Sequence, residues 1–161
     1  RRQRQMCIRD RGNIVKVFGM ARITDMYGPI PYSKFGTALK VAYDSQEDIY
    51  RQFFNELDDA IDVLTEYYAA NSSSKVLAKF DFVFGGNTAS WIKFANTLRL
   101  RLALRVCYAD EALARTEAEK SISHSLGFLE TKAEHCNDSK YSYLNPFWEI
   151  TNSWNLSLIH I

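Results

Sequence analysis

The stretch that decides the fold is Gly85-Gly86-Asn87-Thr88-Ala89-Ser90-Trp91-Ile92-Lys93-Phe94-Ala95-Asn96-Thr97-Leu98-Arg99-Leu100-Arg101-Leu102-Ala103-Leu104-Arg105-Val106. Two glycines interrupt whatever precedes it, and the side chain of Asn87 or Thr88 can accept a hydrogen bond from the first free amides of a helix. Apolar residues then recur at steps of three and four on one face: Trp91, Phe94, Ala95, Leu98, Leu102 and Val106. A second apolar set widens this face: Ile92, Leu100, Ala103 and Leu104. We expect this helix to pack on more than one side, at the centre of the core.

The composition of the chain limits the classes of protein to which it can belong. The 161 residues are 47% hydrophobic, which is enough for one domain with a core. A net charge of +1 gives no electrostatic reason to expect binding to nucleic acid or to an anionic membrane. No apolar run approaches the roughly 18 residues of a membrane span, and the three cysteines have neither metal nor disulfide spacing.

The two ends of the chain can be encoded by DNA strings that are reverse complements of each other. The last six residues, Leu156 to Ile161, can be encoded by CTG TCT CTT ATA CAC ATC. The reverse complement of that string, read in another frame, encodes Met-Cys-Ile-Arg-Asp, which is the sequence of residues 6–10. The string resembles the end of a transposase-based sequencing adapter. We therefore interpret residues 1–11 and 156–161 as non-native, adapter-derived tails around a native segment of residues 12–155.

Three further helices are predicted around the central one. The first spans residues 13–26 and ends at Gly28-Pro29, and the second begins at Asp44 or Ser45 and ends near residue 71. The second carries the clearest apolar stripe: Tyr50, Phe53, Leu57, Ile61, Leu64 and Tyr68. The last spans residues 111–123, with Leu113, Ala114, Ala118 and Ile122 expected to face inward. The pattern predicts an all-α fold of antiparallel helix pairs joined by long irregular loops.

Residues that could carry chemistry are better explained as structural. His124, His135, Cys107 and Cys136 form no closed metal set, so we expect no metal and read both histidines as surface residues. Three acidic side chains are expected on a solvated helix face: Asp58, Asp59 and Asp62. No phosphate loop or nucleophile motif is present, so neither catalysis nor a cofactor is predicted. The arginines of the central helix, Arg99, Arg101 and Arg105, fit buried hydrogen-bonding roles better than a nucleic-acid surface.

Aromatic residues without helical spacing gather near the end of the chain. Rings in loops can stack on the apolar faces of sugars while polar neighbours bind the hydroxyl groups. The alternative is that these rings pack over the edge of the core. The candidate ligand-binding residues are Tyr141, Tyr143, Trp148 and Trp154.

Four motifs in order produce a resemblance to a known family. They are Asp25-Met26-Tyr27-Gly28-Pro29-Ile30-Pro31-Tyr32, Tyr43-Asp44-Ser45-Gln46-Glu47-Asp48-Ile49-Tyr50 continuing into Leu57-Asp58-Asp59-Ala60-Ile61, Phe84-Gly85-Gly86-Asn87, and the helix from Trp91 to Arg105. This series resembles the SusD/RagB family of outer-membrane nutrient-binding lipoproteins, over nearly all of residues 12–155. One departure is Pro29, where the family commonly has an acidic residue.

The resemblance implies a tetratricopeptide-like all-α fold and a function in nutrient uptake. Family members are lipid-anchored on the extracellular face of the outer membrane, where they cover a SusC-like TonB-dependent transporter and capture oligosaccharides or, in some members, peptides. They are several times longer than this chain, which would be an internal fragment without the N-terminal lipid anchor. No ligand residue of the family transfers to a numbered position here.

Two other functions stay open at this point. An intracellular tetratricopeptide-like scaffold could bind protein partners through a groove between its helices. An export signal upstream would separate that alternative from the uptake function. A helical carbohydrate-active enzyme would need two carboxylates facing each other across a cleft.

Overall fold

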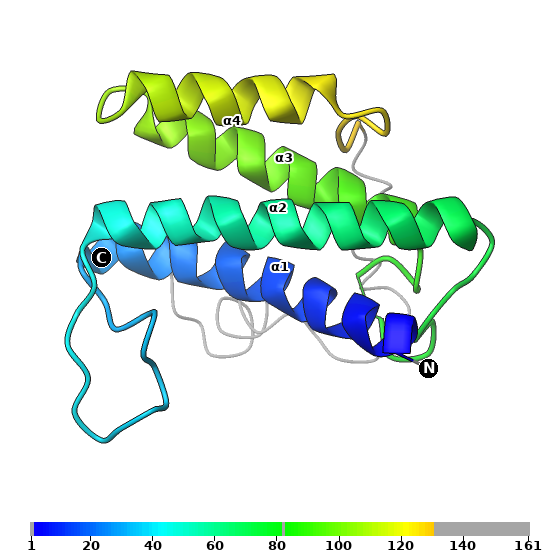
Figure 1. Ribbon diagram of the computed structural model, residues 1–161, viewed down its shortest axis with the longest axis horizontal. Coiled ribbons are helices and arrows are strands. Elements are labelled where there is room, and N and C mark those ends of the chain that lie inside the picture. Colours follow the sequence, from blue (N-terminus) through cyan, green and yellow to red (C-terminus); the bar gives the residue numbers. More distant parts are fainter. Residues whose placement is uncertain (1, 82, 131–161) are drawn as a thin grey trace, which may run out of the picture.

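The computed structural model describes residues 2–81 and 83–130 of the chain. Four helices account for most of them: α1 (Arg2–Tyr27), α2 (Gln46–Ala70), α3 (Thr88–Val106) and α4 (Glu111–Ser123). Within this part of the chain there is no strand, only two isolated bridges between residue pairs. Figure 1 shows that α1 and α2 run antiparallel and that α3 and α4 form a second antiparallel pair. The all-α prediction of antiparallel helix pairs is therefore confirmed.

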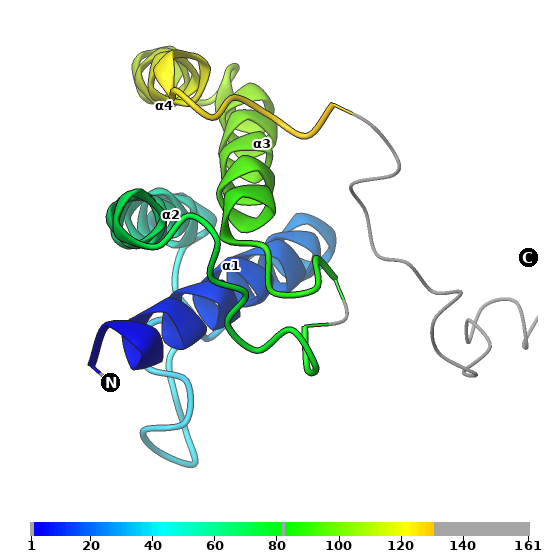
Figure 2. The ribbon, with the colours of Figure 1, turned by 90° about the vertical axis from the view of Figure 1, so that its right-hand side faces the viewer.

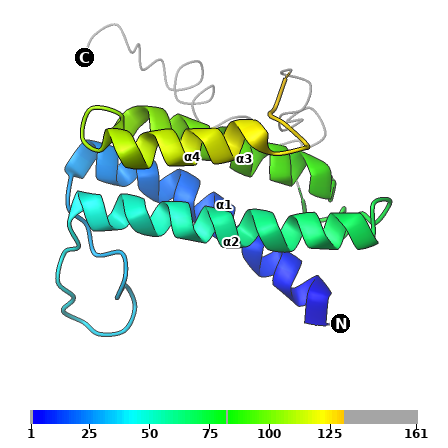
Figure 3. The same ribbon diagram turned by 45° about the horizontal axis from the view of Figure 1, so that its top comes forward.

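The two inner helices of the bundle are α2 and α3. Figure 2 shows them between α1 on one side and α4 on the other, and Figure 3 shows α1 crossing α2. α2 contacts α1 and α3, while α3 contacts α2, α4 and, over a short stretch, α1. The prediction that α3 packs on more than one side is confirmed, although α2 shares the central position.

The ends of α2 and α3 lie where the sequence predicts them. The side chain of Ser45 accepts a hydrogen bond from the backbone N–H of Asp48, and Asn71 closes the helix at its other end. The Asn87 side chain accepts from the backbone N–H groups of Ala89 and Ser90 and so begins α3. The Ser45 and Asn87 caps satisfy amides that would otherwise have no partner inside the helix, and the Asn71 N–H donates to the carbonyl oxygens of Tyr67 and Tyr68.

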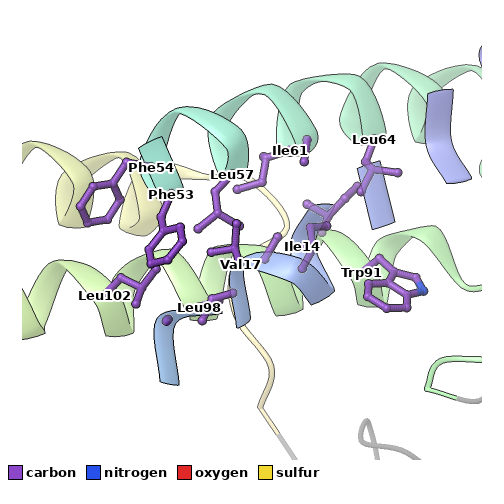
Figure 4. Packing of buried hydrophobic residues seen from close by; sticks show 14 of the residues in the cluster. Ile14, Val17, Phe53, Phe54, Leu57, Ile61, Leu64, Trp91, Leu98 and Leu102 are labelled. Atoms are coloured by element: carbon purple, nitrogen blue, oxygen red, sulfur yellow. The ribbon is translucent and has the colours of Figure 1, made fainter. Parts of the chain in front are cut away.

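The core forms where the apolar faces of three helices meet. Figure 4 shows buried side chains of α1, α2 and α3 meeting there, with Ile14 and Val17 of α1 between those of α2 and α3. The ring of Trp91 packs edge-on against Phe84, with 5.2 Å between the ring centroids, and also contacts Phe94. The most deeply buried residues include Ile14 and Val17 from α1, Phe53, Leu57, Ile61 and Leu64 from α2, and Ile92 and Leu102 from α3.

α1 begins earlier than the sequence predicts. The helix is continuous from Arg2, whereas the apolar pattern indicated a start at residue 13. Cys7, Asp10 and Arg11 are buried, and Arg11 makes contacts that hold the α2–α3 loop in place. The non-native origin of residues 1–11 stays a prediction, but their backbone continues the first helix of the fold.

The loop before α3 is closed around the carboxylate of Asp81. This carboxylate accepts hydrogen bonds from the backbone N–H groups of Val83 (3.1 Å), Phe84 (3.0 Å) and Gly86 (2.8 Å), and from the indole N–H of Trp91 (2.6 Å). The Arg11 guanidinium lies 3.6 Å from the same carboxylate. Because every lone-pair direction meets a donor, this charge is stabilised inside the fold.

Arg11 and Gly86 bring the loop and the first helix into close contact. The guanidinium of Arg11 donates to the carbonyl oxygens of Val76 (2.9 Å) and Gly86 (3.3 Å) and to the hydroxyl of Thr88 (2.9 Å). Gly86 has a φ of +83°, and a Cβ at this position would lie 2.8 Å from the carbonyl oxygen of Val76. Glycine is therefore required at position 86 both by conformation and by space.

Some expectations about individual side chains of α2, α3 and α4 are wrong. Leu104 and Ile122 were expected to be buried, but they are 63% and 65% exposed, because they lie on the outer surfaces of α3 and α4. Asp58 was expected on a solvated face, but it is partly buried and pairs with Arg99 and with Lys120. Ala114 is buried as predicted, and the other buried residues of α4 are polar: Glu117 and Ser121.

Arg99 has the buried role that its apolar neighbours predict. Its guanidinium donates to Ser121 Oγ (2.9 Å) and Asn96 Oδ1 (3.0 Å) and pairs with Asp58. Because these partners come from α2, α3 and α4, one buried cation joins three helices. The buried role expected for Arg101 is wrong, because this side chain is exposed, and Arg105 is half-exposed and pairs with Asp25.

Candidate functional site

A cleft of about 430 Å³ opens at the end of the bundle where α1 finishes and α2 begins. The turn between α3 and α4 reaches the same end (Figure 1). Ten residues from all four helices and the α3–α4 turn line the cleft: Asp25, Gln46, Glu47, Tyr50, Arg51, Arg105, Val106, Ala109, Asp110 and Leu113.

Helix ends place the charged groups of this cleft. Asp25 comes from the last turn of α1, Glu47 and Arg51 from the first turns of α2, and Arg105 from the last turn of α3. Asp110 begins α4, because its carboxylate accepts the backbone N–H of Leu113 at 3.0 Å. The cleft therefore exists only when both helix pairs are assembled.

The charges of the cleft are paired with one another. Arg51 Nη2 lies 3.0 Å from Glu47 Oε1 and 2.9 Å from Asp110 Oδ2. Arg105 Nε lies 2.9 Å from Asp25 Oδ2, and the hydroxyl of Tyr50 donates to Asp25 Oδ1 at 2.6 Å. Ion pairs thus join α2 to the start of α4, and α1 to the end of α3.

The electrostatics of the cleft keep Asp110 ionised and Tyr50 neutral. The pKa of Asp110 is lowered, mainly by the hydrogen bond from the Leu113 backbone and also by Arg51. The pKa of Tyr50 is raised to about 12, first by burial and then by its hydrogen bond to Asp25. A general acid for glycoside cleavage needs a carboxyl group that stays protonated near neutral pH, and Asp110 is shifted in the opposite direction.

Exposed apolar side chains surround this end of the molecule. The loop of residues 28–45 extends away from the helices (Figure 1) and carries Phe35, Leu39 and Tyr43, all exposed. Tyr27 at the end of α1 and Tyr108 in the α3–α4 turn are exposed as well. Rings and apolar side chains in such positions suit contact with a sugar or with another protein.

The base of the 28–45 loop is held firmly although its tip is exposed. The carboxylate of Asp44 accepts from the backbone N–H groups of Tyr32 (2.8 Å) and Ser33 (2.6 Å) and from the Ser33 hydroxyl (2.8 Å). These bonds lower the pKa of Asp44. The Tyr32 hydroxyl donates to Glu56 Oε2 at 2.6 Å and so ties the loop to α2.

The structure does not test the ligand residues predicted from the sequence. Tyr141, Tyr143, Trp148 and Trp154 all lie outside the described residues. His135 and Cys136 lie outside them too, and His124 is partly buried with its Nε2 3.3 Å from Thr65 Oγ1. Across residues 2–81 and 83–130, no group of three or more His, Cys, Asp or Glu side chains is arranged to hold a metal ion. In the same part of the chain, no helix is both long enough and apolar enough to cross a bilayer.

Sequence reasoning missed the cleft, since its residues come from four separate helix ends. The capping signals at residues 44–48 and 110–111 mark where two of these helices begin, but not which helix ends meet. The exposed tip of the 28–45 loop had a clearer signal, because Phe35 and Leu39 lie in a segment with no helical or strand periodicity.

Comparisons with known proteins give a consistent result. The profile of one family, SusD-like, described as SusD and RagB outer membrane lipoprotein, matches residues 3–160. A SusD homolog from Bacteroides vulgatus is 38% identical, with a TM-score of 0.83 over 94% of this chain. A chitin-binding SusD homolog from Flavobacterium johnsoniae is 41% identical, with a TM-score of 0.82 over 90% of this chain. No curated protein sequence matches the chain.

The chain corresponds to one part of these solved homologues. It covers 30% of the length of each of the two. A SusD homolog from Bacteroides uniformis gives the same share, with 40% identity and a TM-score of 0.77 over 91% of this chain. On its sequence profile and its fold, the chain belongs to the SusD-like family of SusD and RagB outer membrane lipoproteins.

Proposed function

We propose that the full-length protein containing this chain captures oligosaccharides as the non-catalytic component of a SusC/SusD-type uptake complex in the outer membrane. The observation that carries the proposal is membership of the SusD-like family, together with 41% identity to a homolog whose structure is described as chitin-binding. The protein would be held on the extracellular face by an N-terminal lipid outside this chain. Its partner would be a SusC-like TonB-dependent transporter.

The chain's own residues support a rigid frame with exposed contact surfaces. Paired helices joined by the buried Arg99 and by the ion pairs of the cleft resist rearrangement. The 28–45 loop presents exposed apolar side chains from a base anchored through Asp44. Contacts with ligand or transporter would then form on loops held by a stable scaffold.

One group of residues is proposed to contact the sugar and another to contact the transporter. The aromatic residues near the end of the chain would stack on the sugar: Tyr141, Tyr143, Trp148 and Trp154. The tip of the 28–45 loop, with Phe35 and Leu39, would contact the transporter. No cofactor is needed, since capture involves no bond making or breaking.

Fractionation of cells of the source organism tests the class of protein and its partner. We expect full-length tagged protein in the outer-membrane fraction, together with a TonB-dependent transporter that remains bound after mild detergent extraction. A variant with Phe35→Ser and Leu39→Ser should reach the same membrane fraction and retain less transporter. Recovery of the wild-type protein from the cytosol would instead support the intracellular scaffold and refute the proposal.

A further inference from the structure

The cleft at the helix ends has the size and the lining of a small-molecule pocket. Its volume of about 430 Å³ falls within the roughly 300–1,000 Å³ of pockets that bind small ligands. Three apolar side chains, Val106, Ala109 and Leu113, line it together with charged and amide groups. Apolar surface beside a small number of placed polar groups is the usual composition of such pockets.

The charged side chains that line the cleft are paired inside it. Arg51 pairs with Glu47 and Asp110. Arg105 pairs with Asp25. The helix dipoles also offset one another, because α2 and α4 begin at this end of the bundle while α1 and α3 finish there (Figure 1). A charged ligand would displace one member of an ion pair and leave the other without its counter-charge, so the cleft favours a neutral polar molecule.

The paired groups keep hydrogen-bonding capacity for such a molecule. A guanidinium carries five N–H groups, and the contacts of Arg51 in the cleft use only its Nε and Nη2. Those same contacts use Oε1 of Glu47, so Oε2 stays available as an acceptor. Gln46 donates to the carbonyl oxygen of Thr24 through Nε2, which leaves its side-chain oxygen able to accept. Because a hydroxyl group both donates and accepts, this mixed set of groups suits a hydroxyl-rich ligand.

Two exposed tyrosines lie beside the cleft. Tyr108 is fully exposed and immediately precedes Ala109 in the α3–α4 turn. Tyr27 is also exposed and follows Asp25 by two residues at the end of α1. Aromatic rings can stack on the apolar faces of sugars while polar neighbours bind the hydroxyl groups. The cleft and its surroundings therefore combine the two kinds of contact that hold a sugar.

The cleft is held in shape by contacts between the helices that form it. The ion pairs join α2 to the start of α4 and α1 to the end of α3. The Tyr50 hydroxyl and the Gln46 amide each add a hydrogen bond from α2 to α1. A preformed site binds a small ligand with less loss of entropy than one that must be ordered.

We propose that the cleft at the helix ends is a binding site for a neutral sugar residue. Val106, Ala109 and Leu113 would contact an apolar face of the sugar ring, while Arg51 and the acids around it would bind the hydroxyl groups. The exposed ring of Tyr108 would stack on the sugar from the rim. The inference rests on the proposed function, since it assumes that the full-length protein captures oligosaccharides, and it adds a sugar site built by the helices themselves.

Titration calorimetry of the full-length protein with chitotriose tests this site. Chitotriose is a neutral trimer of N-acetylglucosamine, chosen because one homolog is described as chitin-binding, and maltotriose is the second neutral probe. Ala109→Trp fills the cleft with an indole and removes none of its charges. Ala112→Trp, at an exposed position of α4 outside the lining, is the matched control. We expect Ala109→Trp to bind the trimer about tenfold more weakly, and Ala112→Trp to stay within about twofold of the wild type.

A second pair of variants leaves the volume of the cleft unchanged. Tyr108→Ala removes a fully exposed ring, so the packing of the helices is kept. Phe80→Ala, at an exposed ring in the α2–α3 loop at the other end of the bundle (Figure 1), is its control. We expect weaker binding only for Tyr108→Ala, and this pair decides alone if Ala109→Trp fails to fold.

The possible results separate this inference from the proposed function. Wild-type affinity in both cleft variants, Ala109→Trp and Tyr108→Ala, would overturn the inference and leave the proposed function in place. Failure of the wild-type protein to bind either trimer would also overturn the inference. Failure to bind any oligosaccharide would overturn the proposed function as well.

Discussion

At the scale of single residues, Asp81 has the greatest influence on local structure. Its carboxylate is almost fully buried, with 5% of its side chain exposed, and it accepts four hydrogen bonds beside Arg11. Removing it would leave a buried guanidinium without a counter-charge and three backbone amides without this acceptor.

We predict that Asp81→Ala lowers the free energy of unfolding of the full-length protein by about 3–5 kcal/mol, the usual cost of breaking a buried ion pair. Urea denaturation monitored by circular dichroism would measure the change. Glu66→Ala, at an exposed acid on α2, is the control and should change stability by less than about 0.5 kcal/mol. A similar small effect for both variants would show that Asp81 does not hold the loop.

Trp91 provides the second test at this scale. The ring is 4% exposed and fills the space between the loop and α3. Trp91→Ala should destabilise the protein by about 3–5 kcal/mol, because it leaves a cavity in the core. Trp91→Phe should cost less, since it keeps most of the apolar volume and loses the hydrogen bond to Asp81. An unchanged thermal melting curve for Trp91→Ala would contradict the packing described.

At the scale of elements, His124 at the end of α4 joins this helix to α2. The Nδ1 of His124 accepts the backbone N–H of Leu126 at 3.3 Å, which leaves Nε2 to donate to Thr65 Oγ1, also at 3.3 Å. The pKa of His124 is lowered, first by burial and then by the positive charge of Arg99, although Asp62 opposes the shift. The folded state therefore favours the neutral imidazole.

The sign of this shift gives a pH prediction. Because the pKa is lower in the folded state than the unfolded value of 6.5, the unfolded state binds more protons below that pH. The contribution of His124 to stability is present above pH 6.5 and is lost as the pH falls through the folded pKa. Urea midpoints at pH 7.5 and 5.5 should differ more for the wild type than for His124→Gln. An equal pH dependence in the two proteins would contradict the neutral, partly buried imidazole.

The sequence predicts the helices better than it predicts their contacts. Ser45, Asn71 and Asn87 mark helix ends through local hydrogen bonds, so their positions can be found without tertiary information. The burial of Asp58 could not be found in this way, because its partners Arg99 and Lys120 are 41 and 62 residues away. Leu104 and Ile122 fit the apolar pattern of their helices but lie on the faces that turn outward.

At the scale of the whole molecule, the order of motifs predicts the family, and the profile match and solved homologues confirm it. The candidate cleft could not be predicted, since it forms only where four helix ends meet. The proposed sugar-contacting residues stay predictions, as do the adapter-derived tails at residues 1–11 and 156–161. A scaffold is specified by periodic patterns, whereas a ligand surface on loops leaves no comparable pattern in one sequence.

The central claim is that the full-length protein captures a glycan without cleaving it. Isothermal titration calorimetry against a panel of chitin-derived, starch-derived and other oligosaccharides tests this claim most directly, with chromatography of the sugars after incubation. We predict saturable binding of at least one oligosaccharide, recovery of that sugar intact, and weaker binding by Trp148→Ala or Trp154→Ala. Absence of binding across the panel, or release of shorter sugars that stops when a single carboxylate is replaced, would contradict the claim.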